Sequence, residues 1–265
     1  MTVPIFLIAN PRSGTHLVRG YLRGSDLVED LGEVFHPGVM RERPHGFFRY
    51  LAGRVASDAD VVSPRREQRA RLFDDYMAHL AGLASTSHLL IDAKYNNTHH
   101  FNGIWHDVDQ VPSLIGLIGD RGYPVIHLMR RNLLQTHCSQ ILASATNRWS
   151  VPSHMVDQHR SDRKITIDTD SIVMQLERLQ TRINFFTWCL RDHAPIARIF
   201  YEDLLADGKI SPDVRDELSE LIGVPLDLVL TPAYAKVSPP LGEFVRNYAD
   251  VIRALSGTRF LTMIS

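Results

Sequence analysis

The fold of this chain is decided near its beginning, by residues 4–18, which read PIFLIANPRSGTHLV. The first six are apolar and rich in large and β-branched side chains, which is typical of a fully buried strand. Pro11 ends this run because it has no backbone donor and fixes φ, and Gly14 allows a tight turn. From Thr15 onward the apolar residues recur at the spacing of one helix face. The stretch therefore predicts a strand, a turn and a helix.

A turn of this kind favours an anion, because it directs backbone N–H groups and the positive end of a helix at one point. Arg12 lies within the turn, and Ser13 and Thr15 add hydroxyl donors, so the favoured ligand is a phosphate. The pattern of nucleotide-hydrolysing P-loops, G-x-x-x-x-G-K-[ST], is not followed, since the turn has one glycine and no lysine after it. The alternative is an ordinary strand-to-helix turn with a solvated Arg12.

A length of 265 residues suits one large α/β domain over residues 1–265 or two small domains, and the single domain is expected because no domain boundary is visible in the sequence. The composition, with 44% hydrophobic and 22% charged residues, is that of a globular protein. The formal net charge of −1 gives no general attraction to nucleic acid or to an anionic membrane. An anionic ligand must therefore be held by a local concentration of positive charge.

The cellular location can be estimated from cysteine usage and from the N-terminal segment. Cys138 and Cys189 both lie in apolar, helical contexts, so free thiols in a reducing compartment are expected rather than a disulfide. The N-terminal segment lacks the pattern of a signal peptide, and its apolar run is too short to span a membrane. We expect a cytoplasmic protein without a membrane span.

A carboxylate and an imidazole follow the first helix closely. Glu33 and His36 lie between Gly32 and Pro37, which predicts a loop or a very short strand. Such a pair beside a phosphate turn offers candidates for a general base, although both could equally be solvated surface residues. Residues 38–70 have no clean periodicity and are interpreted as an irregular segment that shapes the acceptor site.

Two further apolar runs end in positive charge. Residues 88–97 predict a strand that ends in polar residues and carries Lys94 near its end, and residues 124–132 predict a strand that ends in Arg130 and Arg131. Ligands of open parallel sheets collect at the carboxyl ends of strands, so these side chains lie where an anion would bind. Later in the chain we expect a long helix, a fourth strand with an acidic end and a short helix, over residues 172–186, 196–204 and 218–222 respectively.

Neither histidines nor cysteines form a convincing metal-binding pattern. His99 and His100 are adjacent and cannot easily face one tetrahedral ion, and His106 brings no accompanying ligand motif. We therefore expect no metal site.

The helix expected after the third strand carries a hydroxyl, that of Ser139, which could bind an anion together with the arginines at the end of that strand. Ser139 lies eight positions after Arg131, two helical turns further along. The two side chains could hold one phosphate together, or the arginines could form salt bridges at the helix N-terminus.

These two anion motifs, in this order, resemble those of sulfotransferases that use 3′-phosphoadenosine 5′-phosphosulfate (PAPS). That family holds the 5′-phosphosulfate in a loop in which Lys or Arg precedes Ser-Gly-Thr. It holds the 3′-phosphate with an Arg at a strand end and a Ser eight residues later. The segments around Glu33, Lys94 and Arg131 are most similar to the bacterial carbohydrate branch, which includes Nod-factor and trehalose sulfotransferases.

The resemblance implies a P-loop-like, three-layer α/β fold with a mainly parallel central sheet flanked by helices. It implies transfer of a sulfuryl group from PAPS to a hydroxyl of a carbohydrate or another small acceptor, with 3′-phosphoadenosine 5′-phosphate as product and no metal. The 5′-phosphosulfate contacts that it implies are Arg12, Ser13, Gly14, Thr15 and His16. The 3′-phosphate contacts that it implies are Arg131, Ser139 and Lys236, with Arg246 as the weaker candidate from the C-terminal segment.

For catalysis, the resemblance makes Glu33 the leading base and His36 the second candidate, with Arg12 and Lys94 stabilising the developing charge. The Lys-Thr-His segment that carries the catalytic histidine of cytosolic hormone sulfotransferases is absent, which leaves the base open. Trp149 either stacks on an acceptor sugar or belongs to the core.

Two other functions stay open at this point. A kinase-like phosphotransferase would need a magnesium carboxylate, for which Asp92 is a candidate, and a non-catalytic nucleotide-binding protein would lack a working base. The identity of the acceptor and the oligomeric state are also open.

Overall fold

The computed structural model describes residues 2–38, 42–63, 65–102, 110–147, 149, 164–228 and 240–264. Within these ranges the chain forms an α/β fold around a five-stranded parallel sheet with the strand order β2-β3-β1-β4-β5. The strands of this sheet are β1 Val3–Ala9, β2 Val28–Gly32, β3 His88–Lys94, β4 Val125–Met129 and β5 Ile196–Phe200.

Strand β1 is central because its side chains are apolar on both faces. Every residue from Pro4 to Ala9 is buried, and the strand pairs with β3 on one side and with β4 on the other. Alternate residues face opposite sides of the sheet. Leu7 belongs to one hydrophobic core and Phe6 to the other, so both faces of the sheet are covered.

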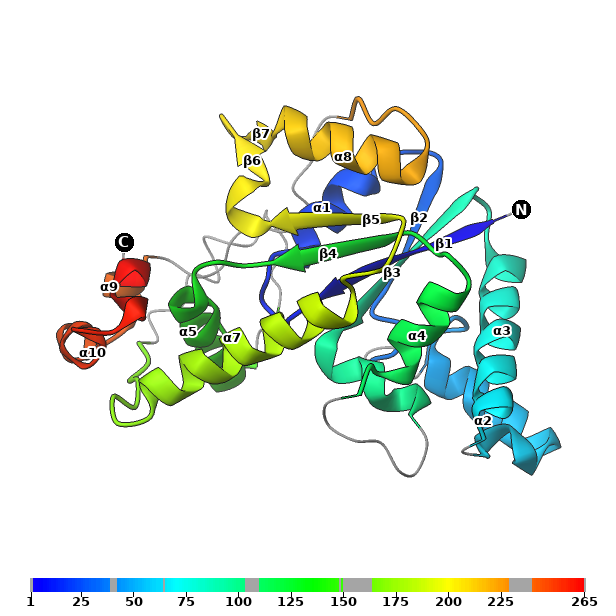
Figure 1. The fold of residues 1–265 in the computed structure, drawn as a ribbon, viewed down its shortest axis with the longest axis horizontal. Coiled ribbons are helices and arrows are strands. Elements are labelled where there is room, and N and C mark those ends of the chain that lie inside the picture. The colour runs from blue at the N-terminus through cyan, green and yellow to red at the C-terminus, as the bar shows by residue number, and fades with distance from the viewer. Residues whose placement is uncertain are drawn as a thin grey trace.

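Helices on the two faces give the molecule three layers (Figure 1). Helices α1 and α8 cover one face, and α3, α4, α5 and α7 lie on the other. The α-helices are α1 Thr15–Leu22, α2 Phe47–Ser57, α3 Arg66–Leu83, α4 Ser113–Asp120, α5 Leu133–Thr146, α7 Ile172–Cys189, α8 Pro212–Ile222, α9 Leu241–Phe244 and α10 Tyr248–Leu255. The short elements are η1 Ala59–Val62, η2 Tyr95–Phe101, η4 Tyr201–Asp203, η5 Arg259–Ile264 and the hairpin strands β6 Leu205–Ala206 and β7 Lys209–Ile210.

The expected α/β architecture with a mainly parallel sheet is confirmed. All five strands run in the same direction, so their carboxyl ends meet at one edge of the sheet. The residues that follow these ends come from segments far apart in the sequence, and they form the site described below. No helix among the described residues is both long and apolar enough to cross a lipid bilayer.

Helix α2 departs from the sequence expectation for residues 38–70. Its Phe47 is the one residue on the helix that is fully buried, against Tyr76 of α3 and Phe101. A helix that buries so narrow a face leaves little periodic signal in the sequence. The two cysteines are free thiols, as expected, with Cys138 buried and Cys189 partly exposed.

Candidate functional site

The turn after β1 has a backbone that only particular residues can adopt. Gly14 has φ +91°, and a Cβ atom at this position would lie 2.2 Å from the ring of Tyr201. Arg12 also has a positive φ, +70°, which costs a residue with a side chain about 1–2 kcal/mol. Helix α1 begins directly after Gly14, so the first amides of the helix, which have no helical acceptor, lie at the turn.

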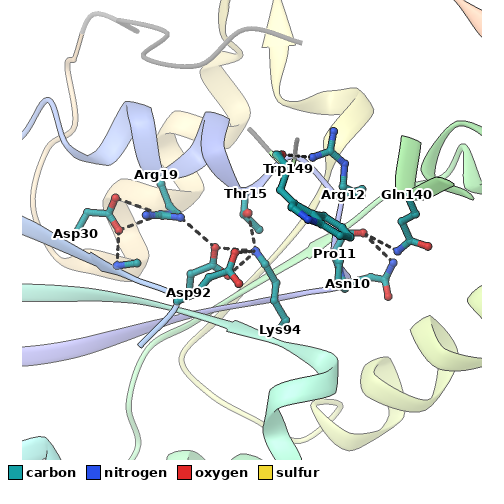
Figure 2. Close-up of polar contacts among 12 residues, drawn as sticks. Asn10, Pro11, Arg12, Thr15, Arg19, Asp30, Asp92, Lys94, Gln140 and Trp149 are labelled. Atoms are coloured by element: carbon teal, nitrogen blue, oxygen red, sulfur yellow. Dashed lines mark hydrogen bonds and ion pairs between the residues drawn. The ribbon is translucent and has the colours of Figure 1, made fainter. Parts of the chain in front are cut away.

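Arg12 reaches from the turn across to α5. Its Nε donates to the hydroxyl of Ser139 at 2.9 Å, although 126 residues separate the two in the chain. Its Nη1 donates to the backbone carbonyl of Trp149, which lies beside the turn (Figure 2). Two residues that the sequence assigned to different phosphates are therefore in direct contact.

Arg130 is the second cation at this place, and it is almost completely buried. Its Nη1 donates to the carbonyl of Arg12 at 3.0 Å, its Nη2 donates to Gln135, and its guanidinium lies 4.4 Å from the ring centre of Tyr201. The buried Nε atom of Arg130 has no hydrogen-bond partner among the described residues.

The two guanidinium groups create a site that suits an anion. Burial and, secondarily, the neighbouring Arg130 lower the pKa of Arg12, and burial lowers the pKa of Arg130. Within the described part of the chain, neither side chain has a carboxylate at ion-pair distance, and their oxygen partners are all neutral. Because buried charges are normally paired, a phosphate fits the donors gathered here.

Lys94 forms the centre of a second cluster at the end of β3. Its Nζ atom donates to both carboxylate oxygens of Asp92 and to the hydroxyl of Thr15, each at 2.7 Å, and lies 3.6 Å from Glu33 Oε1 (Figure 2). On the other side, Arg19 Nη1 lies 3.5 Å from Asp92. Lys94 therefore connects the first residue of α1 with the candidate base.

Glu33 and His36 lie in the turn that follows β2. The amide of His36 donates to the carbonyl of Glu33 at 2.9 Å, and the Nδ1 atom of His36 accepts from the amide of Gly38 at 3.1 Å. In the neutral ring this contact puts the proton on Nε2. The carboxylate of Glu33 lies within 4 Å of the Lys94 ammonium.

The guanidinium of Arg131 forms an ion pair with Asp203. Its two terminal nitrogens donate to the two carboxylate oxygens of Asp203, each at 2.6 Å, and its guanidinium lies 4.0 Å from the ring centre of Phe200. About half of each side chain of this ion pair is exposed. The hydrogen bonds from Arg131 lower the pKa of Asp203; the positive charge of Arg131 adds to this effect, and burial opposes it.

The remaining predicted residues of the turn are enclosed. Ser13 is buried, and its amide donates to the carbonyl of Asn10 at 3.3 Å. Burial, together with the positive charges of Arg19 and Lys94, lowers the pKa of His16 to about 4, so this imidazole is neutral at pH 7.

Three further candidates came from the sequence, and two of them are described. Lys236 lies outside the described residues. Arg246 is described, and its amide donates to the carbonyl of Ile165 at 2.8 Å. Trp149 is 49% exposed, so it does not belong to the core.

Sequence reasoning did not single out Arg19, which the structure brings into these clusters. It considered Asp92 as a magnesium carboxylate and Arg130 as one of two arginines at a strand end, but not the contacts that these two side chains make here. Two signals were present. Asp92 stands two positions before Lys94, which puts both on one face of β3, and Arg130 adjoins Arg131 at the end of β4.

Comparison with known proteins shows a similarity at the level of structure. No protein-family model and no curated protein matches the chain. Among solved structures, the chain is similar to a sulfotransferase from Alicyclobacillus acidocaldarius. The alignment covers 100% of this chain and 96% of that one, with 13% sequence identity and a TM-score of 0.47.

Proposed function

We propose that this protein is a sulfotransferase that moves a sulfuryl group from PAPS to the hydroxyl of a carbohydrate or another small acceptor. The observation that carries the proposal is the path of contacts from the phosphate turn to the candidate base. Thr15 at the start of α1 accepts from Lys94, and Lys94 lies 3.6 Å from Glu33. The sequence resemblance to the sulfotransferase motifs supports the choice of donor.

The donor's charged groups would be held at the carboxyl ends of β1 and β4. Arg12, the amides of the turn and the hydroxyls of Ser13 and Thr15 would bind the 5′-phosphosulfate. Arg130 adds a buried cation that has no carboxylate at ion-pair distance in the described chain. Arg131 and Ser139 would bind the 3′-phosphate, which requires Arg131 to leave Asp203.

In the transfer step, Glu33 would take the proton of the acceptor hydroxyl while the acceptor oxygen forms a bond to sulfur. The bond between sulfur and the bridging phosphate oxygen breaks, and its electron pair stays on that oxygen. General-base catalysis of this kind contributes about 10²–10⁴-fold. Arg12 and Lys94 would stabilise the charge that develops on the phosphate, a contribution that is usually the largest in catalysis.

Glu33 is preferred to His36 as the base because of its surroundings. The contact from the Gly38 amide occupies Nδ1 of His36, and Nε2 then holds the proton of the neutral ring. Glu33→Gln should lower kcat by at least about 100-fold and leave the dissociation constant of the donor product little changed. Undiminished turnover in this variant would remove Glu33 as base and make His36→Gln the next variant to measure.

The donor is tested by calorimetric titration with 3′-phosphoadenosine 5′-phosphate, 5′-AMP and ATP with magnesium. We expect micromolar binding of the bisphosphate, much weaker binding of 5′-AMP, and a loss of at least about 10-fold in Arg131→Ala. Equal or tighter binding of ATP with magnesium would contradict the proposal and favour a kinase-like function. The structure gives one argument against that alternative, since both oxygens of Asp92 already accept from Lys94.

A further inference from the structure

Asp92 is the most deeply buried charged residue of the described site. It lies on β3, opposite Leu7 of β1, and its side chain is completely inaccessible to solvent. A carboxylate at such a position must be compensated by positive charge and hydrogen bonds. Lys94, two residues further along the same face of the strand, supplies both.

The contacts of Lys94 show that Asp92 helps to set the position of the ammonium group. An ammonium has three hydrogens to donate. Its hydrogen-bond partners are the carboxylate of Asp92 and the hydroxyl of Thr15, each at 2.7 Å. Glu33 Oε1, at 3.6 Å, lies beyond hydrogen-bond distance. Asp92 thus holds the ammonium against the first turn of α1 and keeps it from closing onto Glu33.

Asp92 is itself supported from α1 and β2. Arg19 Nη1 lies 3.5 Å from Asp92, and Arg19 Nε donates to Asp30 at 3.0 Å. Burial alone would lower the pKa of Arg19, but the carboxylates of Asp30 and Asp92 raise it above its usual value. Asp30 also accepts from the amide of Gly32, the residue before Glu33. The cluster therefore links the backbone just before the candidate base to the phosphate turn, through Asp30, Arg19, Asp92 and Lys94 (Figure 2).

We propose that Asp92 is a positioning residue, which fixes the Lys94 ammonium at the transferring group and leaves the carboxylate of Glu33 available to the acceptor hydroxyl. This inference rests on the proposed function for the roles of Lys94 and Glu33. The position of the ammonium can be measured without it.

The kinetic test compares two isosteric variants that each remove one buried carboxylate. Asp92→Asn should lower kcat by about 100-fold, because misplacing a reacting group by about 1 Å has an effect of this size. The dissociation constant of 3′-phosphoadenosine 5′-phosphate should change by less than about 3-fold. Asp30→Asn removes a carboxylate of similar burial that contacts Arg19 and Arg23 but not Lys94. Asp30→Asn should therefore lower kcat by no more than about 10-fold, against about 100-fold in Asp92→Asn. Equal losses of kcat in the two variants would overturn the positioning role.

A spectroscopic test on the wild-type protein does not depend on turnover or on the folding of Asp92→Asn. The chain has four lysines, so labelling lysine with ¹⁵N gives at most four Nζ signals. Lys164 and Lys209 are exposed and should exchange their protons quickly, whereas the enclosed ammonium of Lys94 should give a persistent signal, assigned by its loss in Lys94→Arg. This signal should shift more in Thr15→Val, which removes a hydrogen-bond partner at 2.7 Å, than in Glu33→Gln, which removes a charge at 3.6 Å.

The two measurements separate the possible failures. A Lys94 signal that moves at least as far in Glu33→Gln as in Thr15→Val, or that is absent from the wild-type spectrum, would overturn the inference about Asp92. A wild-type protein that neither binds the bisphosphate nor transfers sulfuryl groups would overturn the proposed function, and the Lys94 signal would still decide where the ammonium lies.

Discussion

At the scale of single residues, the arginines of the site differ in whether their partners are charged. Arg12 and Arg130 contact neutral oxygens, whereas Arg131 is bound by the carboxylate of Asp203. The sequence predicted Arg12 and Ser139 as parts of two separate motifs. It could not show that they contact each other, because such a contact depends on how β1 and β4 pair and on where α5 runs.

Asp203 should compete with the 3′-phosphate for Arg131. Exposed ion pairs contribute about 0–1 kcal/mol, so Asp203→Asn should tighten binding of 3′-phosphoadenosine 5′-phosphate by up to about 5-fold, measured by calorimetry at pH 7. Asp192→Asn, which removes the partner of Arg191 in another exposed pair, is the matched control and should leave the affinity unchanged. Weaker binding in Asp203→Asn would show that Asp203 orients Arg131 rather than competing for it.

At the scale of elements, the strands were predictable and the edges of the site were not. Strands β1, β3 and β4 follow from short apolar runs, because a strand covered on both faces needs few polar residues. Strand β2 carries Glu29 and Asp30 and pairs with β3 alone, so its sequence reads as a loop. Its identity as an edge strand depends on a partner that is 60 residues away in the sequence.

The turn between β1 and α1 should tolerate no side chain at Gly14. Gly14→Ala combines an unfavourable φ with a contact of 2.2 Å to Tyr201, and should lower the free energy of unfolding by about 2–4 kcal/mol and abolish binding of the bisphosphate. Gly122→Ala is the control, since it has φ +61° with no atom within 4 Å of the added Cβ. Gly122→Ala should lower the free energy of unfolding by about 1 kcal/mol and leave binding of the bisphosphate unchanged. Urea denaturation of both variants checks this, and equal losses would show that the contact with Tyr201 has no effect of its own.

At the scale of the whole molecule, stability should decrease as the pH falls from about 6.5 to about 4. Burial lowers the pKa of His127 to about 4, with a smaller contribution from Arg198, and burial likewise lowers that of His16. In this range the unfolded chain binds protons that the folded chain does not, which favours unfolding. Each such proton changes the free energy of unfolding by about 1.4 kcal/mol per pH unit.

Urea denaturation at pH 7.5, 6.0 and 5.0 measures this slope. His127→Gln removes one of the titrating groups, so its slope should be smaller than that of the wild type by about one proton between pH 6 and 5. Parallel slopes in the two proteins would show that His127 takes up its proton in the folded state as readily as in the unfolded one.

The positive φ of Arg12 has a consequence for how this sequence responds to selection. The backbone at this position would suit glycine better, so Arg12→Gly relieves the conformational cost while it removes the guanidinium that reaches Ser139. A selection for thermal stability alone would therefore favour Arg12→Gly, and the selected variants would lack the guanidinium of the anion site. At this position stability favours glycine and ligand binding favours arginine, so only selection for ligand binding would keep the arginine.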